Sequence, residues 1–191
     1  MTSLDFDIHT TTERVQGGAF DYASRVGLWA VVVVAALIFP LDDPHVARVA
    51  LFTHLMSMAV GFGAVVMVDV YGLMWLVGHK TLADVVEMAT TAHIVIASAV
   101  GGLLASGIAL RPNLGSPMGQ FKMVLVLVLM LNGAAAQRML HRMKRSLPPD
   151  TRGANIPWSD FQRVIRAAVI SQSSWWGAIA IGFITSVNRH T

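Results

Sequence analysis

Five long apolar stretches constrain this chain more than any other feature of its sequence. They cover residues 23–40, 46–78, 81–110, 121–141 and 160–187. A helix that crosses a bilayer needs about 20 mostly apolar residues, and each stretch reaches or approaches that length. Short connections join the first four stretches, as is typical of antiparallel neighbours in a helical bundle. The sequence therefore predicts an all-α integral membrane protein with five transmembrane helices.

The composition supports the same class. Hydrophobic residues make up 54% of the 191 residues and charged residues only 13%, whereas a soluble domain has about 25% charged residues. This leaves too little polar surface to cover a globule in water, which argues against a soluble enzyme and against a nucleic-acid-binding protein. The chain has no cysteine, so disulfides, zinc knuckles and iron–sulfur clusters are excluded. We expect a lipid bilayer as its environment, and a bacterial inner membrane as its location.

The distribution of Lys and Arg predicts the orientation. Ten of these 14 residues fall on the side of the bundle that carries the N-terminus, and only Arg48, Arg111, Lys122 and Arg189 fall on the other. Because cytoplasmic loops collect positive charge, we expect the N-terminus inside and the C-terminus outside. The chain is then divided into a polar cytoplasmic segment (1–22), one transmembrane domain (23–187) and an outer tail (188–191). Within the first segment, the spacing of Thr10 and Glu13 predicts a capping box and a short surface helix.

Local signals predict how the helices begin and where they touch. Asp43, followed by Pro44, and Thr81 are suited to cap the helices that follow them. The series Ser98-x-x-x-Gly102-x-x-x-Ser106 places small residues on one helix face, which indicates a close helix–helix contact.

Polar residues within the apolar stretches are functional candidates, because they are costly in a bilayer and usually face the bundle interior. They are His54, Asp69, Glu87, His93, Lys122, Asn132, Gln137, His141 and Gln172. Glu87 and its neighbour Asp84 lie in the first turns of a helix, where carboxylates are favoured for structural reasons. His141 lies among basic residues and is expected on a solvated face.

One stripe in the second stretch combines several candidates. At 100° per residue, a single face of that helix holds His54, Met58, Gly61, Val65, Asp69 and Gly72. Small residues and methionine also suit an ordinary packing face. A histidine in such a face still needs a partner or a ligand.

Depth in the membrane decides which candidates can act together. Reflecting the chain about the turn near residue 79 places His54 level with about residue 105, roughly 18 Å from the level of His93. This disfavours one haem held between His54 and His93. The sequence instead predicts an outer site around His54 and Lys122, and an inner site around His93, His141 and Asp69.

Three segments of the chain together resemble known membrane proteins. They are Thr53-His-Leu-Met-Ser-Met-Ala-Val-Gly-Phe-Gly63, then Ala105-Ser-Gly-Ile-Ala-Leu110, and then the apolar run from Phe121-Lys to Asn-Gly133. The chain is similar to the HemJ-type protoporphyrinogen oxidases and the CopD-type copper-resistance proteins over about residues 46–142. The resemblance implies a helical core of haem-binding type, in which His54 and Lys122 match functional positions of the HemJ type. Asn132 stands where that type often has a second histidine.

We consider three functions from this sequence. The first is binding of haem b for electron transfer, haem handling or porphyrin oxidation, which would make an oxidoreductase. Its candidate ligands are His54 and His93, with Met58 nearby and with Lys122 facing a propionate. Asp69 is the candidate proton-handling group, and His54, His93 and His141 are the candidate metal ligands.

The second function is a small transporter or channel for protons or metal ions, lined by Asp69, Glu87 and His93. The third is an accessory subunit without catalysis, because small-residue helix faces also suit a protein that only packs against partners. A homo-oligomer or a larger membrane complex is compatible with all three.

Overall fold

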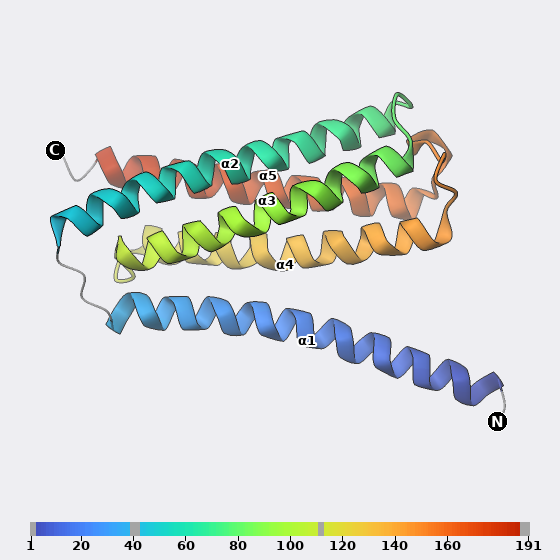
Figure 1. Ribbon diagram of the computed structural model, residues 1–191, viewed down its shortest axis with the longest axis horizontal. Helices are drawn as coiled ribbons and strands as arrows, with labels where there is room; N and C mark the ends of the chain where they lie inside the picture. Colours follow the sequence, from blue (N-terminus) through green and yellow to red (C-terminus); the bar gives the residue numbers. More distant parts are fainter. Residues whose placement is uncertain (1–2, 39–42, 111–112, 188–191) are drawn as a thin grey trace.

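The computed structural model describes residues 3–38, 43–110 and 113–187, and these residues form five long α-helices, one short 3₁₀ turn and no strand. The elements are α1 (Ser3–Ile38), α2 (Pro44–Leu76), α3 (Leu82–Ala109), α4 (Pro117–Ser146), η1 (Gly153–Asn155) and α5 (Trp158–Val187). Each helix contains a window that is long and apolar enough to cross a membrane. The predicted all-α bundle with five membrane-spanning helices is therefore confirmed. The ends of α1 and α5 that carry the two termini lie at opposite ends of the molecule (Figure 1).

The helix starts follow the capping chemistry of the sequence. Asp43 accepts a hydrogen bond from the backbone N–H of His45 at 2.8 Å, and Thr81 forms a capping box with Asp84. Both predicted caps are confirmed, as is the structural role expected of Asp84. Ser116 caps α4, so this helix begins before the predicted residue 121.

The first helix differs most from its expected bounds. We predicted a polar segment with a short surface helix, followed by a span from residue 23, but α1 is continuous from Ser3. The apolar window inside it begins at Asp21, close to the predicted start. A helix can extend past its apolar part because its backbone hydrogen bonds are internal, and α1 has no proline to interrupt them. The predicted tail, 188–191, and the connection at 39–42 lie outside the described residues.

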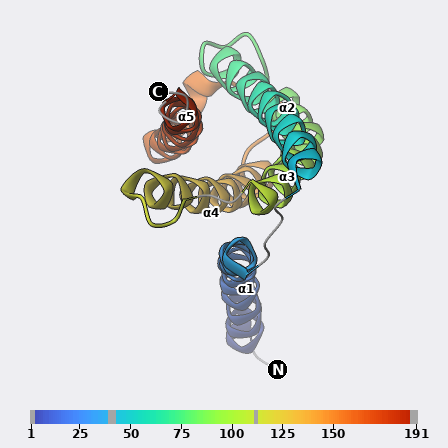
Figure 2. The same cartoon turned by 90° about the vertical axis from the view of Figure 1, so that its left-hand side faces the viewer.

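Two antiparallel helix pairs make up the bundle. The α2 helix packs along α3 and α4 packs along α5, while α1 lies outside against α3 and α4 (Figure 2). Small residues allow α2 and α3 to approach closely. A Cβ atom added at Gly61 would lie 2.8 Å from the Cβ of Ala99, and one added at Gly102 would collide with Ser57. Gly102 and Ser106 of the predicted small-residue series therefore face α2, whereas Ser98 is exposed.

The connection between α4 and α5 closes one end of the bundle by covering the turn between α2 and α3. The backbone carbonyl of Thr151 accepts from the Trp75 indole N–H and from the Leu82 backbone N–H, both at 2.9 Å. Arg152 donates to the Gly78 carbonyl at 2.9 Å. Trp75 and Leu82 are only 2% exposed. The α4–α5 connection thus holds the two helix pairs to each other at this end.

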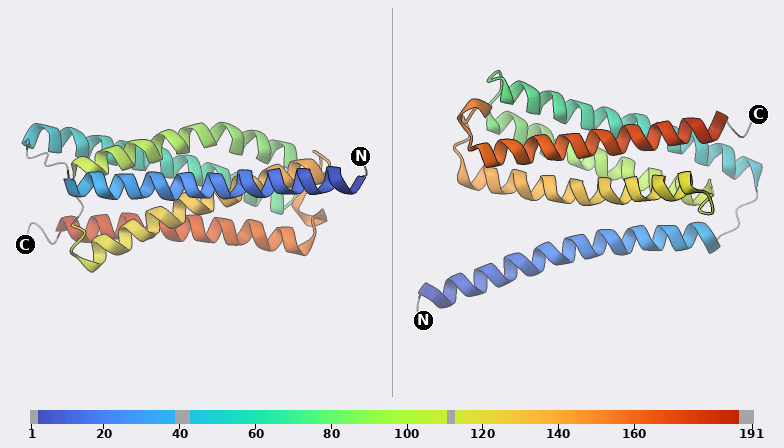
Figure 3. Two further views of the ribbon diagram at one scale, coloured as in Figure 1. Left: turned by 90° about the horizontal axis from the view of Figure 1, so that it is seen from below. Right: turned by 180° about the vertical axis from the view of Figure 1, so that it is seen from behind.

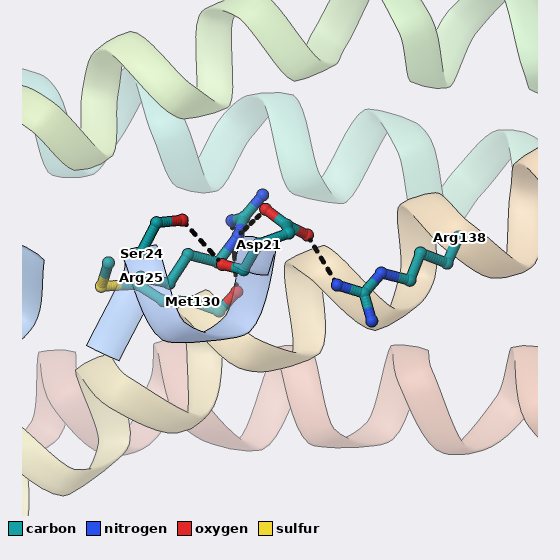
Figure 4. A network of polar contacts seen from close by, with 5 residues as sticks. All are labelled: Asp21, Ser24, Arg25, Met130 and Arg138. Carbon is teal, nitrogen blue, oxygen red and sulfur yellow. Dashed lines mark hydrogen bonds and ion pairs between the residues drawn. The ribbon is translucent and has the colours of Figure 1, made fainter. Parts of the chain in front are cut away.

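A polar network attaches α1 to α4 (Figure 4). The Asp21 carboxylate accepts from Arg25 at 3.1 Å and from Arg138 of α4 at 3.0 Å. Arg25 also donates to the Met130 carbonyl at 3.3 Å, and the Arg138 guanidinium lies 3.9 Å from the centre of the Tyr22 ring. Before this network, the N-terminal half of α1 diverges from the other helices (Figure 3).

Replacing Asp21 with alanine is expected to lower the stability of the protein by about 1 kcal/mol, because two partly exposed ion pairs are lost together. Thermal unfolding in detergent measures this loss. Arg163→Ala is the matched control, since its ion pair with Asp160 lies within α5 and joins no helices. Equal unfolding temperatures for the two variants would contradict the role of Asp21.

Candidate functional site

The polar stripe predicted on α2 faces the bundle interior. Gly61 and Val65 are buried, and His54, Met58, Asp69 and Gly72 are half-buried. Residues between them, such as Leu55 and Val60, are exposed on the other side of the helix. The predicted face therefore exists, and α3 and α5 both contact it.

His54 has a defined partner on α3. Its Nδ1 lies 3.0 Å from the Ser106 hydroxyl oxygen, and Ser106 is only 5% exposed. The Ser106 hydroxyl is also 2.6 Å from the Gly102 carbonyl oxygen. Because a carbonyl can only accept, the single hydroxyl proton of Ser106 belongs to that bond.

The bond between His54 and Ser106 must then be donated by the imidazole. With Nδ1 as the donor, the lone pair of the neutral ring lies on Nε2. Ser106 therefore orients the ring and determines its tautomer. This arrangement resembles that of a metal-binding histidine, whose second nitrogen usually donates to a neighbouring acceptor.

Lys122 of α4 is the charged neighbour of this histidine. It is half-buried, and its ammonium group acts electrostatically on the His54 ring. The same ammonium lies 3.7 Å from the position that a Cβ of Gly182 would occupy, so it reaches the surface of α5. The Lys122 ammonium is therefore near enough for its charge to act on His54, and side chains or backbone of all four helices of the two pairs surround this region.

Aromatic rings fill the next layer, about two turns from His54. The Phe62 ring of α2 lies 5.9 Å from Trp175 and 5.1 Å from Trp176, centre to centre. Gly61 provides the space for Trp175, because an added Cβ would lie 3.2 Å from the Cη2 atom of that indole. These contacts connect α2 to α5 on the interior side.

The predicted inner site is not assembled as expected. Asp69 instead accepts a hydrogen bond from Gln172 of α5 at 2.5 Å, which joins the two helix pairs. His141 is exposed on α4. In the part of the chain that the structure describes, no three His, Cys, Asp or Glu side chains are grouped to hold a metal ion. His54, His93 and His141 therefore do not form a single metal centre.

His93 lies far from the site around His54. It is half-buried on α3, thirteen residues before Ser106, which corresponds to about 20 Å along the helix. Glu87 is exposed and borders a groove of about 560 Å³ together with Lys144. Asn132 donates to the Ala167 carbonyl at 2.9 Å and so joins α4 to α5.

Sequence reasoning missed the part that two residues of this region play. Ser106 was expected only as a helix contact, although the predicted depth of His54 placed it within one residue of Ser106. Nothing in the sequence distinguished the indole N–H of Trp175 from those of the other tryptophans. No known protein family, curated protein or solved structure matches this chain.

Proposed function

We propose that this chain is an integral membrane protein that binds haem b, with His54 as an axial ligand of the iron. The observation that carries the proposal is the hydrogen bond from His54 Nδ1 to Ser106. With Nδ1 donating to Ser106, the neutral imidazole has its lone pair on Nε2, which is the form that binds iron.

The number of nearby ligands favours haem over a bare metal ion. A protein site for a bare transition-metal ion usually supplies three or four side-chain ligands, and the described residues contain no such group. A haem iron receives four nitrogens from the porphyrin, so one or two protein ligands are enough. The donor set around His54 fits this second case.

Lys122 is suited to meet a propionate group. It is a compact positive charge beside His54, in a bundle whose other surfaces are largely apolar. Met58, one turn after His54 on the same face, adds a soft side chain to the wall. When bound, haem supplies one-electron chemistry, and the residues of the chain bind it, orient it and exclude water.

Within this proposal, the reaction is electron transfer, haem handling or porphyrin oxidation in a bacterial inner membrane. The likeness to the HemJ-type and CopD-type proteins points in the same direction. Transport along Asp69, Glu87 and His93 has less support, because Asp69 bonds to Gln172 and Glu87 is exposed at a groove.

The first test is an absorption spectrum of the detergent-purified protein, made with ample haem supply and recorded before and after dithionite. A Soret band that sharpens on reduction, with the α and β bands of a b-type haem, would support the proposal. A colourless protein would overturn it.

Ser106→Ala is expected to weaken haem binding by about 10- to 100-fold, the usual loss when a partner that orients a metal-binding histidine is removed. Haem titration of the apoprotein measures the dissociation constant. Ser98→Ala is the control, because Ser98 lies two turns away on the same helix and is exposed. If the two variants bind haem equally well, Ser106 does not orient the ligand.

A further inference from the structure

We propose that the indole N–H of Trp175 is a hydrogen-bond donor to the ligand bound at His54. For haem, the acceptor is a propionate carboxylate. This inference rests on the proposed function and assigns α5, which lies outside the region of family resemblance, a direct part in ligand binding.

The Trp175 indole is buried without an acceptor for its N–H. Trp175 is 3% exposed, and its Nε1 is buried and has no hydrogen-bond partner in the described part of the protein. Buried polar groups in proteins nearly always have a partner, and an exception calls for a specific explanation, such as a bound molecule.

The other tryptophans show that this chain satisfies buried indole groups elsewhere. Trp29 donates to the Met123 carbonyl at 3.1 Å, and Trp75 donates to the Thr151 carbonyl at 2.9 Å. Trp158 and Trp176 are 68% and 59% exposed, so neither of their side chains is enclosed by the protein. Trp175 is the tryptophan whose N–H is both buried and unpartnered.

The position of Trp175 places this donor on the ligand side of the bundle. Its Cζ2 and Cη2 atoms, on the same side of the ring as Nε1, face Gly61. Gly61 belongs to the interior stripe of α2 that also carries His54, two turns away. Lys122 contacts α5 at Gly182, seven residues or about 10 Å further along the helix from Trp175.

The chemistry of the ligand follows from these groups. Trp175 is a neutral donor whose buried N–H requires an acceptor oxygen, and the positive charge of Lys122 favours an acceptor that is an anion. Haem is a flat apolar ligand with carboxylate groups on its edge, so a carboxylate can accept from Trp175 while the porphyrin ring lies among apolar and aromatic side chains.

The test is Trp175→Phe, which removes the N–H and keeps most of the aromatic surface. We expect haem to bind roughly ten- to a hundredfold more weakly, because a hydrogen bond to a charged acceptor is lost. Without haem, the variant is expected to lose less stability than Trp75→Phe does, because both variants lose the same buried ring atoms but only Trp75→Phe also loses a hydrogen bond.

Two controls separate this role from simple packing. Trp176→Phe changes an exposed indole beside the same Phe62 ring and is expected to leave haem binding unchanged. Trp75→Phe removes an N–H that has a protein partner, so it is expected to lower the unfolding temperature of the haem-free protein. A smaller loss of stability for Trp175→Phe than for Trp75→Phe in the haem-free protein is the distinctive result.

Each outcome has a separate meaning. If the unchanged protein binds haem but Trp175→Phe binds it equally well, this inference is wrong and the proposed function stands. If Trp175→Phe destabilises the haem-free protein as much as Trp75→Phe does, the indole N–H has a protein partner and the inference fails. If the unchanged protein binds no haem, the proposed function fails first.

Discussion

His54→Ala is expected to abolish the Soret band of the purified protein while leaving the helical bundle assembled. The imidazole is the only side chain that we propose to bind the iron directly. Its removal should therefore weaken haem binding by more than the ~10–100-fold that follows removal of an orienting partner. The absorption spectrum measures haem content, and size-exclusion chromatography in detergent measures assembly. His54 is half-buried, and alanine removes its hydrogen bond to Ser106 but leaves the close α2–α3 contacts at Gly61 and Gly102 in place.

His93→Ala is the matched control, because His93 is also half-buried but lies about 20 Å from Ser106 along α3. A second check is His54→Gly with imidazole added to the buffer, which supplies the same ligand from solution and should restore the band. If His93→Ala loses the band and His54→Ala keeps it, the ligand has been assigned to the wrong histidine.

Gly153→Ala is expected to be the most damaging substitution in the connections between helices. A Cβ at this position would collide with the Leu76 backbone and lie 2.8 Å from the Trp75 carbonyl oxygen. Backbone atoms cannot rotate away as a side chain can, so the α4–α5 connection must move off the α2–α3 turn. Overpacking of this kind lowers protein stability by about 1–3 kcal/mol. In this variant the hydrogen bonds to the Thr151 carbonyl would be strained as well.

Thermal unfolding in detergent, together with the yield of monodisperse protein, measures this effect. Gly101→Ala and Gly133→Ala are the controls, because an added Cβ at either position meets no atom within 4 Å. If Gly153→Ala were as stable as these two variants, Gly153 would not pack closely against the α2–α3 turn.

The sequence predicted much of the site around His54 for a simple geometric reason. Two antiparallel helices joined by a short turn rise at the same rate, so a residue on one can be matched in depth to a residue on the other. This placed His54 beside Ser106 and near Lys122. The role of Ser106 was missed because depth alone does not show which way a side chain points.

The inner site shows where that reasoning stops. Asp69, His93 and His141 were matched in depth, but depth does not determine the direction of a helix face. In the folded chain, Asp69 bonds to Gln172 of α5 and His141 is exposed on α4. The long connection before α5 allowed no comparable estimate of how α5 lies against α2.

By itself, the sequence determined that this protein is a bundle of five membrane-spanning helices, and it determined most of the helix starts. These features depend on apolar length and on capping residues, which are local. The tertiary structure alone decided the tautomer of His54, the closure of one end by the α4–α5 connection and the burial of the Trp175 N–H. Each of these depends on how separate helices meet, since a hydrogen-bond partner is a property of two surfaces and not of one stretch of chain.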